Sequence, residues 1–156
     1  MNELFSEKFQ AVLVDLTRDL RYWSSNEKQL IAPQVVKTLP PPPGSAAEVD
    51  SEYPMVCWAV YKGEISTKPQ PVRVLVDMGI KVDETSGTTI EQIRHGSANI
   101  TQLISTVGEL KNNRRIGGYR LQMPFEFIIG DQSPGFEGAQ PHPYYHGRIY
   151  LSFLPM

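Results

Sequence analysis

The sequence has little of what several classes of protein need. A single cysteine, Cys57, among 156 residues excludes an internal disulfide framework. The net charge of −2 gives no overall attraction to nucleic acid or to an anionic membrane. No apolar run is long enough to span a bilayer, and the first ten residues carry acids where a secretory signal is basic and then apolar. We therefore expect a soluble protein made in a reducing cytoplasm, without membrane contact.

Residues with catalytic or metal-binding chemistry are also few. Of the 3 histidines, His142 and His146 are four residues apart. On a helix this spacing aligns two metal ligands, but the prolines on either side of His142 forbid a helix there. Cys57 lies inside an apolar segment, where a thiol is inert. We predict no catalytic constellation and no cofactor; a small metal-dependent enzyme using His142, His146 and Asp131 is the less favoured alternative.

Prolines and glycines are abundant by contrast, and they gather in two long loops. Residues 40–52 begin as a stiff polyproline segment and end as an acidic arm, and residues 130–143 form the second loop. Long loops in a small domain are often functional, so we predict contacts with other molecules there. The candidate residues in the two loops are Pro40, Pro41, Glu48, Asp50, Glu52, Asp131, Phe136 and Glu137. A proline-rich ligand of a recognition domain is the alternative for the first loop.

One short basic cluster, Arg114 and Arg115, follows a predicted helix. Positive charge is favourable at the C-terminal end of a helix, and a nucleic-acid site needs more than two arginines. We therefore keep Arg114 and Arg115 as candidates for contacts between proteins.

The longest alternating segment, residues 119–129, predicts a strand with one packed face and one solvent-exposed face. Six apolar residues would share the packed face: Tyr119, Leu121, Met123, Phe125, Phe127 and Ile129. Because Pro124 cannot donate a hydrogen bond to a neighbouring strand, we expect an edge position or a bulge there. Further strands are predicted at 33–39, 53–61, 71–78 and 144–154, of which 53–61 and 71–78 should pair as a hairpin.

Apolar residues at helical spacing predict two helices. The first covers residues 3–22, with Asn2 as N-cap, and the second covers residues 97–112. A short helical turn is expected at 88–93, with Gly96 weakening its continuation. The chain is thus predicted to form a single α+β domain over 1–156, with residues 1–30 as its N-terminal helix and turn. Two helices would pack on a mostly antiparallel sheet of four to five strands.

The order of several motifs resembles the tail-terminator-like proteins of long-tailed bacteriophages. The motifs are APQVVKTLPPPP, SEYPMVCWAVYKGE, PVRVLV, LKNNRRIGG, YRLQMPFEF and QPHPYYHGRIYLSF. The matching region runs from about Pro33 to Phe153. The N-terminal helix and the link from Val82 to Ala98 are longer than in that family.

The resemblance implies a structural virion protein and no enzyme. Such proteins form a ring, typically of six copies, at the head-proximal end of the tail, assembled in the host cytoplasm. The ring docks on the last ring of the tail tube protein, stops tube polymerisation and offers a surface to the head completion (connector) protein. DNA passes through the lumen without specific binding, and the acids Glu48, Asp50 and Glu52 would suit such a lumen. Another head–tail joining or minor tail protein is the alternative.

Overall fold

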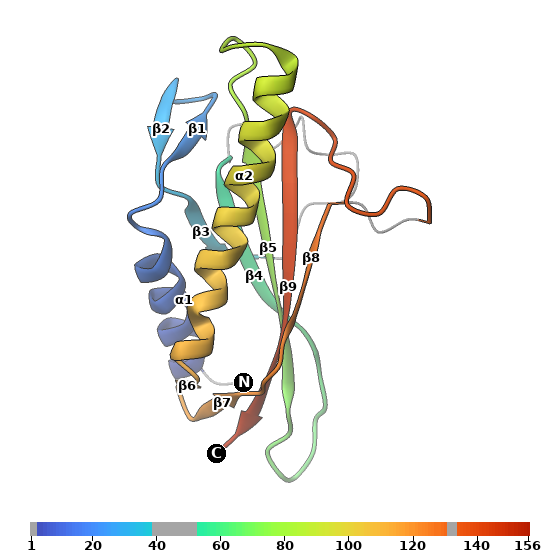
Figure 1. Ribbon diagram of the computed structural model, residues 1–156. Coiled ribbons are helices and arrows are strands. Elements are labelled where there is room, and N and C mark those ends of the chain that lie inside the picture. Colours follow the sequence, from blue (N-terminus) through green and yellow to red (C-terminus); the bar gives the residue numbers. More distant parts are fainter. Residues whose placement is uncertain (1–2, 39–52, 131–133) are drawn as a thin grey trace.

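The computed structural model describes residues 3–38, 53–130 and 134–156. It is an α+β fold in which two α-helices cover one face of a curled, mostly antiparallel sheet (Figure 1). The elements are α1 (Glu3–Thr17), β1 (Tyr22–Ser24), β2 (Gln29–Ile31), β3 (Gln34–Lys37), β4 (Met55–Gly63), β5 (Val72–Lys81), α2 (Thr89–Val107), the 3₁₀ helix η2 (Gly108–Asn112), β6 (Arg115–Ile116), β7 (Tyr119–Leu121), β8 (Glu126–Ile129) and β9 (Tyr144–Pro155). The predicted caps and loops at Asn2 and 40–52 lie outside the described residues.

Among the described residues, the main sheet has seven strands in the order β3-β4-β5-β9-β7-β6, with β8 also paired to β9. Of the strand pairs in this described part of the chain, only β3 and β4 run parallel, and the predicted β4–β5 hairpin is confirmed. The prediction of four to five strands was wrong for two reasons. The segment 119–129 forms two strands, and the Gly117-Gly118 turn adds β6 in front of them.

The strand predicted at 119–129 is interrupted at Pro124. β7 pairs with the last residues of β9, and β8 pairs with residues 147–150 of the same strand. Pro124 lacks the N–H that a continuous strand would donate, which explains the interruption. The predicted packed face is correct only in part: Leu121 is buried and Tyr119, Phe125 and Ile129 pack partly against the core, whereas Met123 and Phe127 are exposed. The predicted edge position is correct: β8 has β9 on one side and no other strand of the described residues beside it.

The helix boundaries also differ from the prediction. α1 ends at Thr17, whose hydroxyl donates to the Leu13 carbonyl oxygen at 2.8 Å, and the chain then enters the short β1–β2 ribbon. The second helix begins eight residues earlier than predicted, at Thr89, because the Thr88 side chain accepts from the Glu91 N–H and caps it. It passes through Gly96 without a break.

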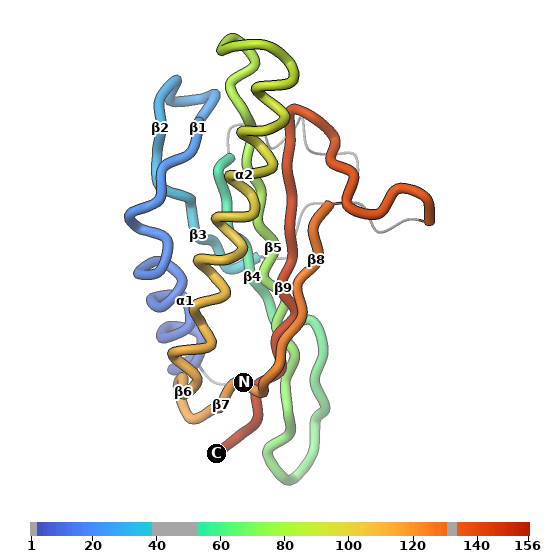
Figure 2. The backbone as a smooth tube through the Cα atoms, viewed as in Figure 1, coloured from blue at the N-terminus to red at the C-terminus, as the bar shows by residue number. Residues whose placement is uncertain are grey.

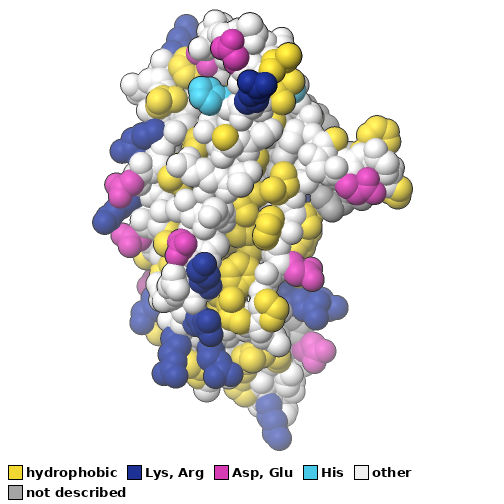
Figure 3. Space-filling model, viewed as in Figure 1, with side chains coloured by type: hydrophobic (Ala, Val, Ile, Leu, Met, Phe, Trp, Pro, Cys, Tyr) yellow, Lys and Arg dark blue, Asp and Glu magenta, His cyan; other side chains and the backbone are white. Residues whose placement is uncertain are grey.

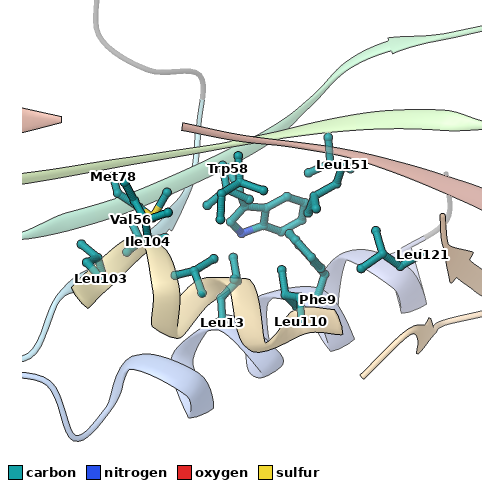
Figure 4. Close-up of a cluster of buried hydrophobic side chains, with 14 of the residues drawn as sticks. Phe9, Leu13, Val56, Trp58, Met78, Leu103, Ile104, Leu110, Leu121 and Leu151 are labelled. Carbon is teal, nitrogen blue, oxygen red and sulfur yellow. The ribbon is translucent and has the colours of Figure 1, made fainter. Parts of the chain in front are cut away.

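The hydrophobic core lies between the helices and the sheet (Figure 4). Phe9 of α1 packs edge-on against Trp58 of β4, with 4.7 Å between ring centroids. The Trp58 indole N–H donates to Gln10 Oε1 at 2.7 Å, and Gln10 Nε2 donates to the Val35 carbonyl oxygen at 2.9 Å. These contacts fix α1 to β3 and β4. On β9 the predicted inward face is confirmed, since Ile149, Leu151 and Phe153 are buried.

Gly96 is the point where α2 comes closest to the sheet. A Cβ atom on Gly96 would lie 2.2 Å from the Tyr145 ring of β9. Alanine at a helix-interior glycine usually stabilises by about 0.5–1 kcal/mol. Here we expect the opposite sign, because the ring is packed and must move, and overpacking of this kind costs about 1–3 kcal/mol.

The matched control for Gly96→Ala is Gly108→Ala at the end of the same helix. Nothing lies within 4 Å of the Cβ position at Gly108, and its φ of −59° suits any residue. Urea denaturation should therefore show a lower free energy of unfolding for Gly96→Ala and an equal or higher one for Gly108→Ala. Two variants of equal stability would contradict the close packing of α2 on Tyr145.

Candidate assembly surfaces

The edge of the sheet at β8 carries uncovered apolar side chains. We call three of these residues the β8 strip: Met123, Phe125 and Phe127. Phe125 packs partly against the core, whereas Phe127 is 58% exposed. Apolar side chains gather over this edge, next to α2 (Figure 3). An open strand edge and exposed aromatic groups are features that proteins normally cover or protect. The β8 strip is therefore a candidate contact surface.

A second uncovered surface is the end of the β4–β5 hairpin, residues 60–71, here called the hairpin tip. The hairpin extends beyond the helices at the lower end of the molecule (Figure 2). Val60 and Tyr61 are exposed, and the side chain of Ile65 is fully exposed to solvent. The hairpin tip and the β8 strip lie on different parts of the surface, so a contact between two copies could join unlike patches.

The predicted interface residues do not form one surface. Phe136 and Glu137 are exposed on the arm that precedes β9, on the right in Figure 1, whereas Arg114 and Arg115 lie at the lower end beside η2 and in β6. The other candidates lie outside the described residues: Pro40, Pro41, Glu48, Asp50, Glu52 and Asp131. Sequence reasoning missed the β8 strip, because it assigned Met123 and Phe127 to a packed face.

The face of the sheet opposite the helices contains an ion pair between a buried carboxylate and a partly exposed arginine. Asp77 of β5 is only 5% exposed, and its Oδ1 lies 3.5 Å from Nε of Arg148, its register partner on β9. Burial raises the pKa of Asp77 to about 6, and the Arg148 charge partly opposes that rise. The thiol of Cys57, in the neighbouring position on β4, is buried as predicted.

The two histidines of the predicted metal alternative contact tyrosines. His142 Nδ1 lies 2.7 Å from the Tyr145 hydroxyl, and His146 Nε2 lies 3.2 Å from the Tyr53 hydroxyl. Burial, together with the nearby Arg148 charge, lowers the pKa of His146. Within residues 3–38, 53–130 and 134–156, no three His, Cys, Asp or Glu side chains come together as a metal site. The alternative with Asp131 falls on a residue outside these ranges.

No protein-family model matches the chain, and no curated protein matches it. None of the described helices has the length and apolar character needed to cross a membrane.

Proposed function

We propose that this protein is the tail terminator of a long-tailed bacteriophage. In this role copies of the chain form a closed ring of six that caps the tail tube, stops its polymerisation and joins it to the head connector. The protein acts as a structural component of the virion at the head-proximal end of the tail, with no catalytic step and no cofactor. DNA passes through the ring.

The observation that carries this proposal is the pair of uncovered surfaces on one small domain. The β8 strip presents Phe127 beside a strand that forms an edge of the sheet within the described residues, and the hairpin tip presents Ile65 at the end of the projecting hairpin. A contact between two unlike patches repeats from copy to copy, and it forms a ring when the rotation closes. The order of sequence motifs from about Pro33 to Phe153 supports the same assignment.

The first test is the mass of the purified protein by light scattering, alone and mixed with its tail tube protein, with negative-stain images of the mixture. We expect a particle of six chain masses, or caps on tube ends that stop tube growth. A monomer that leaves tube growth unchanged would contradict the proposal and would direct the search to the connector proteins.

Phe127→Lys tests the contribution of the β8 strip to this assembly. A charged side chain in a desolvated contact is unfavourable, so we expect the particle mass to fall to that of smaller species at the same concentration. Leu30→Lys is the matched control, because Leu30 is equally exposed but lies on β2, away from the strip. An unchanged mass for Phe127→Lys, or an equal loss for both variants, would remove the β8 strip from the interface.

A further inference from the structure

The lower end of the molecule carries a concentrated positive charge. Between Gly108 and Leu121 the sequence contains four basic residues, all exposed: Lys111, Arg114, Arg115 and Arg120. Glu109 is the one acidic residue in that segment, which leaves a charge of +4 − 1 = +3. Basic side chains gather at this end, below α2 (Figure 3). The whole protein has a net charge of −2, so this end differs in sign from the average of the chain.

The fold places two of these arginines directly against each other. Arg115 of β6 and Arg120 of β7 are register partners in an antiparallel pair, with Arg114 next to them in the chain. We call Arg114, Arg115 and Arg120 the arginine ribbon. Like charges directly opposite across a strand pair destabilise it. Within the described residues no salt bridge offsets this repulsion, since the ion pairs there involve Asp15, Glu84 and Asp77 with other partners.

The arginine ribbon is held in a fixed geometry. Gly117 and Gly118 form its turn with φ values of 54° and 86°, as a tight two-residue hairpin requires. A Cβ on Gly117 would lie 2.5 Å from the Cα of Phe5, so the turn packs directly on the first turn of α1. The Leu121 N–H donates to the Arg114 carbonyl oxygen at 2.7 Å. The backbone that carries the three guanidinium groups is therefore rigid. The repulsion between their charges destabilises the strand pair, and a bound anion would remove it.

We propose that the arginine ribbon, with Lys111, binds the phosphate backbone of double-stranded DNA. Guanidinium groups pair with phosphate in a bidentate geometry. No large apolar side chain between Gly108 and Leu121 is exposed, whereas the centre of a protein–protein interface is usually apolar. The choice of DNA among large anions rests on the proposed function, in which DNA passes the protein. The contact carries no base specificity, because none of the four cations needs to enter a groove.

The test is fluorescence anisotropy of a labelled DNA duplex with the full chain at a series of salt concentrations. Four phosphate contacts predict that the binding constant falls about 150-fold between 50 and 200 mM salt. For the variant Arg114→Ala/Arg115→Ala/Arg120→Ala we expect weaker binding at low salt and a fall of only about 4-fold over the same range.

The matched control removes the same charge elsewhere, in Arg18→Ala/Arg21→Ala/Arg94→Ala. These three arginines are exposed and lie near the C-terminal end of α1 and the N-terminal end of α2. The control should keep the salt dependence of the unmodified protein. Absence of DNA binding at low salt, or an equal loss in the control, would overturn the proposal. The ribbon variant should remain folded, because its three side chains are exposed, although it loses the hydrogen bond from Arg114 Nε to the Lys111 carbonyl oxygen.

The same variants separate this proposal from the proposed function. If the ribbon variant loses DNA affinity but still forms rings that cap tubes, both proposals stand. If it keeps its DNA affinity and loses tube capping, the ribbon contacts an acidic protein surface, and the DNA proposal fails while the terminator proposal stands. If the unmodified protein binds DNA but forms no ring and ignores tubes, the terminator proposal fails on its own.

Discussion

Phe9→Ala should lower the free energy of unfolding by about 3–5 kcal/mol, the usual cost of removing a fully buried phenylalanine side chain. Phe9 contacts three other aromatic rings: it stacks on Phe5 at 5.5 Å between centroids, and it meets Trp58 edge-on at 4.7 Å and Phe153 at 5.6 Å. No other ring in the described core joins α1 to both β4 and β9. Removing the Phe9 ring should therefore weaken the packing of α1 on both β4 and β9.

The measurement is urea denaturation followed by circular dichroism and tryptophan fluorescence. Val14→Ala is the control, because Val14 lies on the exposed side of the same helix and its truncation should change stability by less than about 0.5 kcal/mol. If Phe9→Ala is too unstable to purify, Phe9→Leu keeps most of the volume and should show a smaller loss in the same direction. Equal stabilities for the Phe9 and Val14 variants would contradict the placement of α1.

The second large effect is a pH dependence that originates at Asp77. Its pKa is about 6 in the folded protein and has an ordinary value of 3.8. Because the pKa of Asp77 is higher in the folded than in the unfolded protein, Asp77 makes its full contribution to the free energy of unfolding below pH 3.8. This contribution is lost as the pH rises through 6. A pKa difference of this size between the folded and unfolded states corresponds to about 3 kcal/mol in the free energy of unfolding. The Arg148 ion pair limits the penalty of the buried carboxylate but does not abolish it.

His146 acts in the opposite direction. Its pKa is lowered in the folded protein, so its contribution to the free energy of unfolding is present above the ordinary value of 6.5 and is lost as the pH falls.

The effects of Asp77 and His146 partly cancel in the unmodified protein, and single variants are needed to separate them. Relative to Asp77→Asn, the unmodified protein should lose about 2 kcal/mol between pH 4 and pH 7, because part of the effect already lies below pH 4. Relative to His146→Gln, it should gain stability over that range. Urea denaturation at several pH values measures both; a flat difference for Asp77→Asn would mean that its carboxylate is well solvated.

The α+β class and the β4–β5 hairpin could be predicted because their signals are local. Alternating valines at 72, 74 and 76 face the core as their period of two requires. The same rule held only in part at 119–129, where Leu121 is buried but Met123 and Phe127, which alternate correctly, remain exposed. Periodicity states which side chains share a face. It does not state whether another element covers that face.

The candidate site was less predictable, since it depends on pairings between distant strands. Asp77 and Arg148 are 71 residues apart, and only the register of β5 with β9 makes them partners. Arg115 and Arg120 carried a usable signal: the two-residue Gly-Gly turn in RIGGYR places the residues two positions before and after it opposite each other. From the sequence alone Gly96 predicts a weak point of a helix, because the sequence does not show the Tyr145 ring that occupies the space beside it.

The central position of β9 has a consequence for biosynthesis. β9 follows every other element in the sequence, yet it lies between β5 on one side and β7 and β8 on the other. While the chain emerges from the ribosome, β5, β7 and β8 lack the strand that pairs with all three of them. This side of the sheet therefore cannot form until β9 has been synthesised. Sheet assembly through such distant contacts is slow. We therefore expect nascent chains to depend on chaperones until translation passes residue 155, and a chain cut before Tyr144 to aggregate through β5.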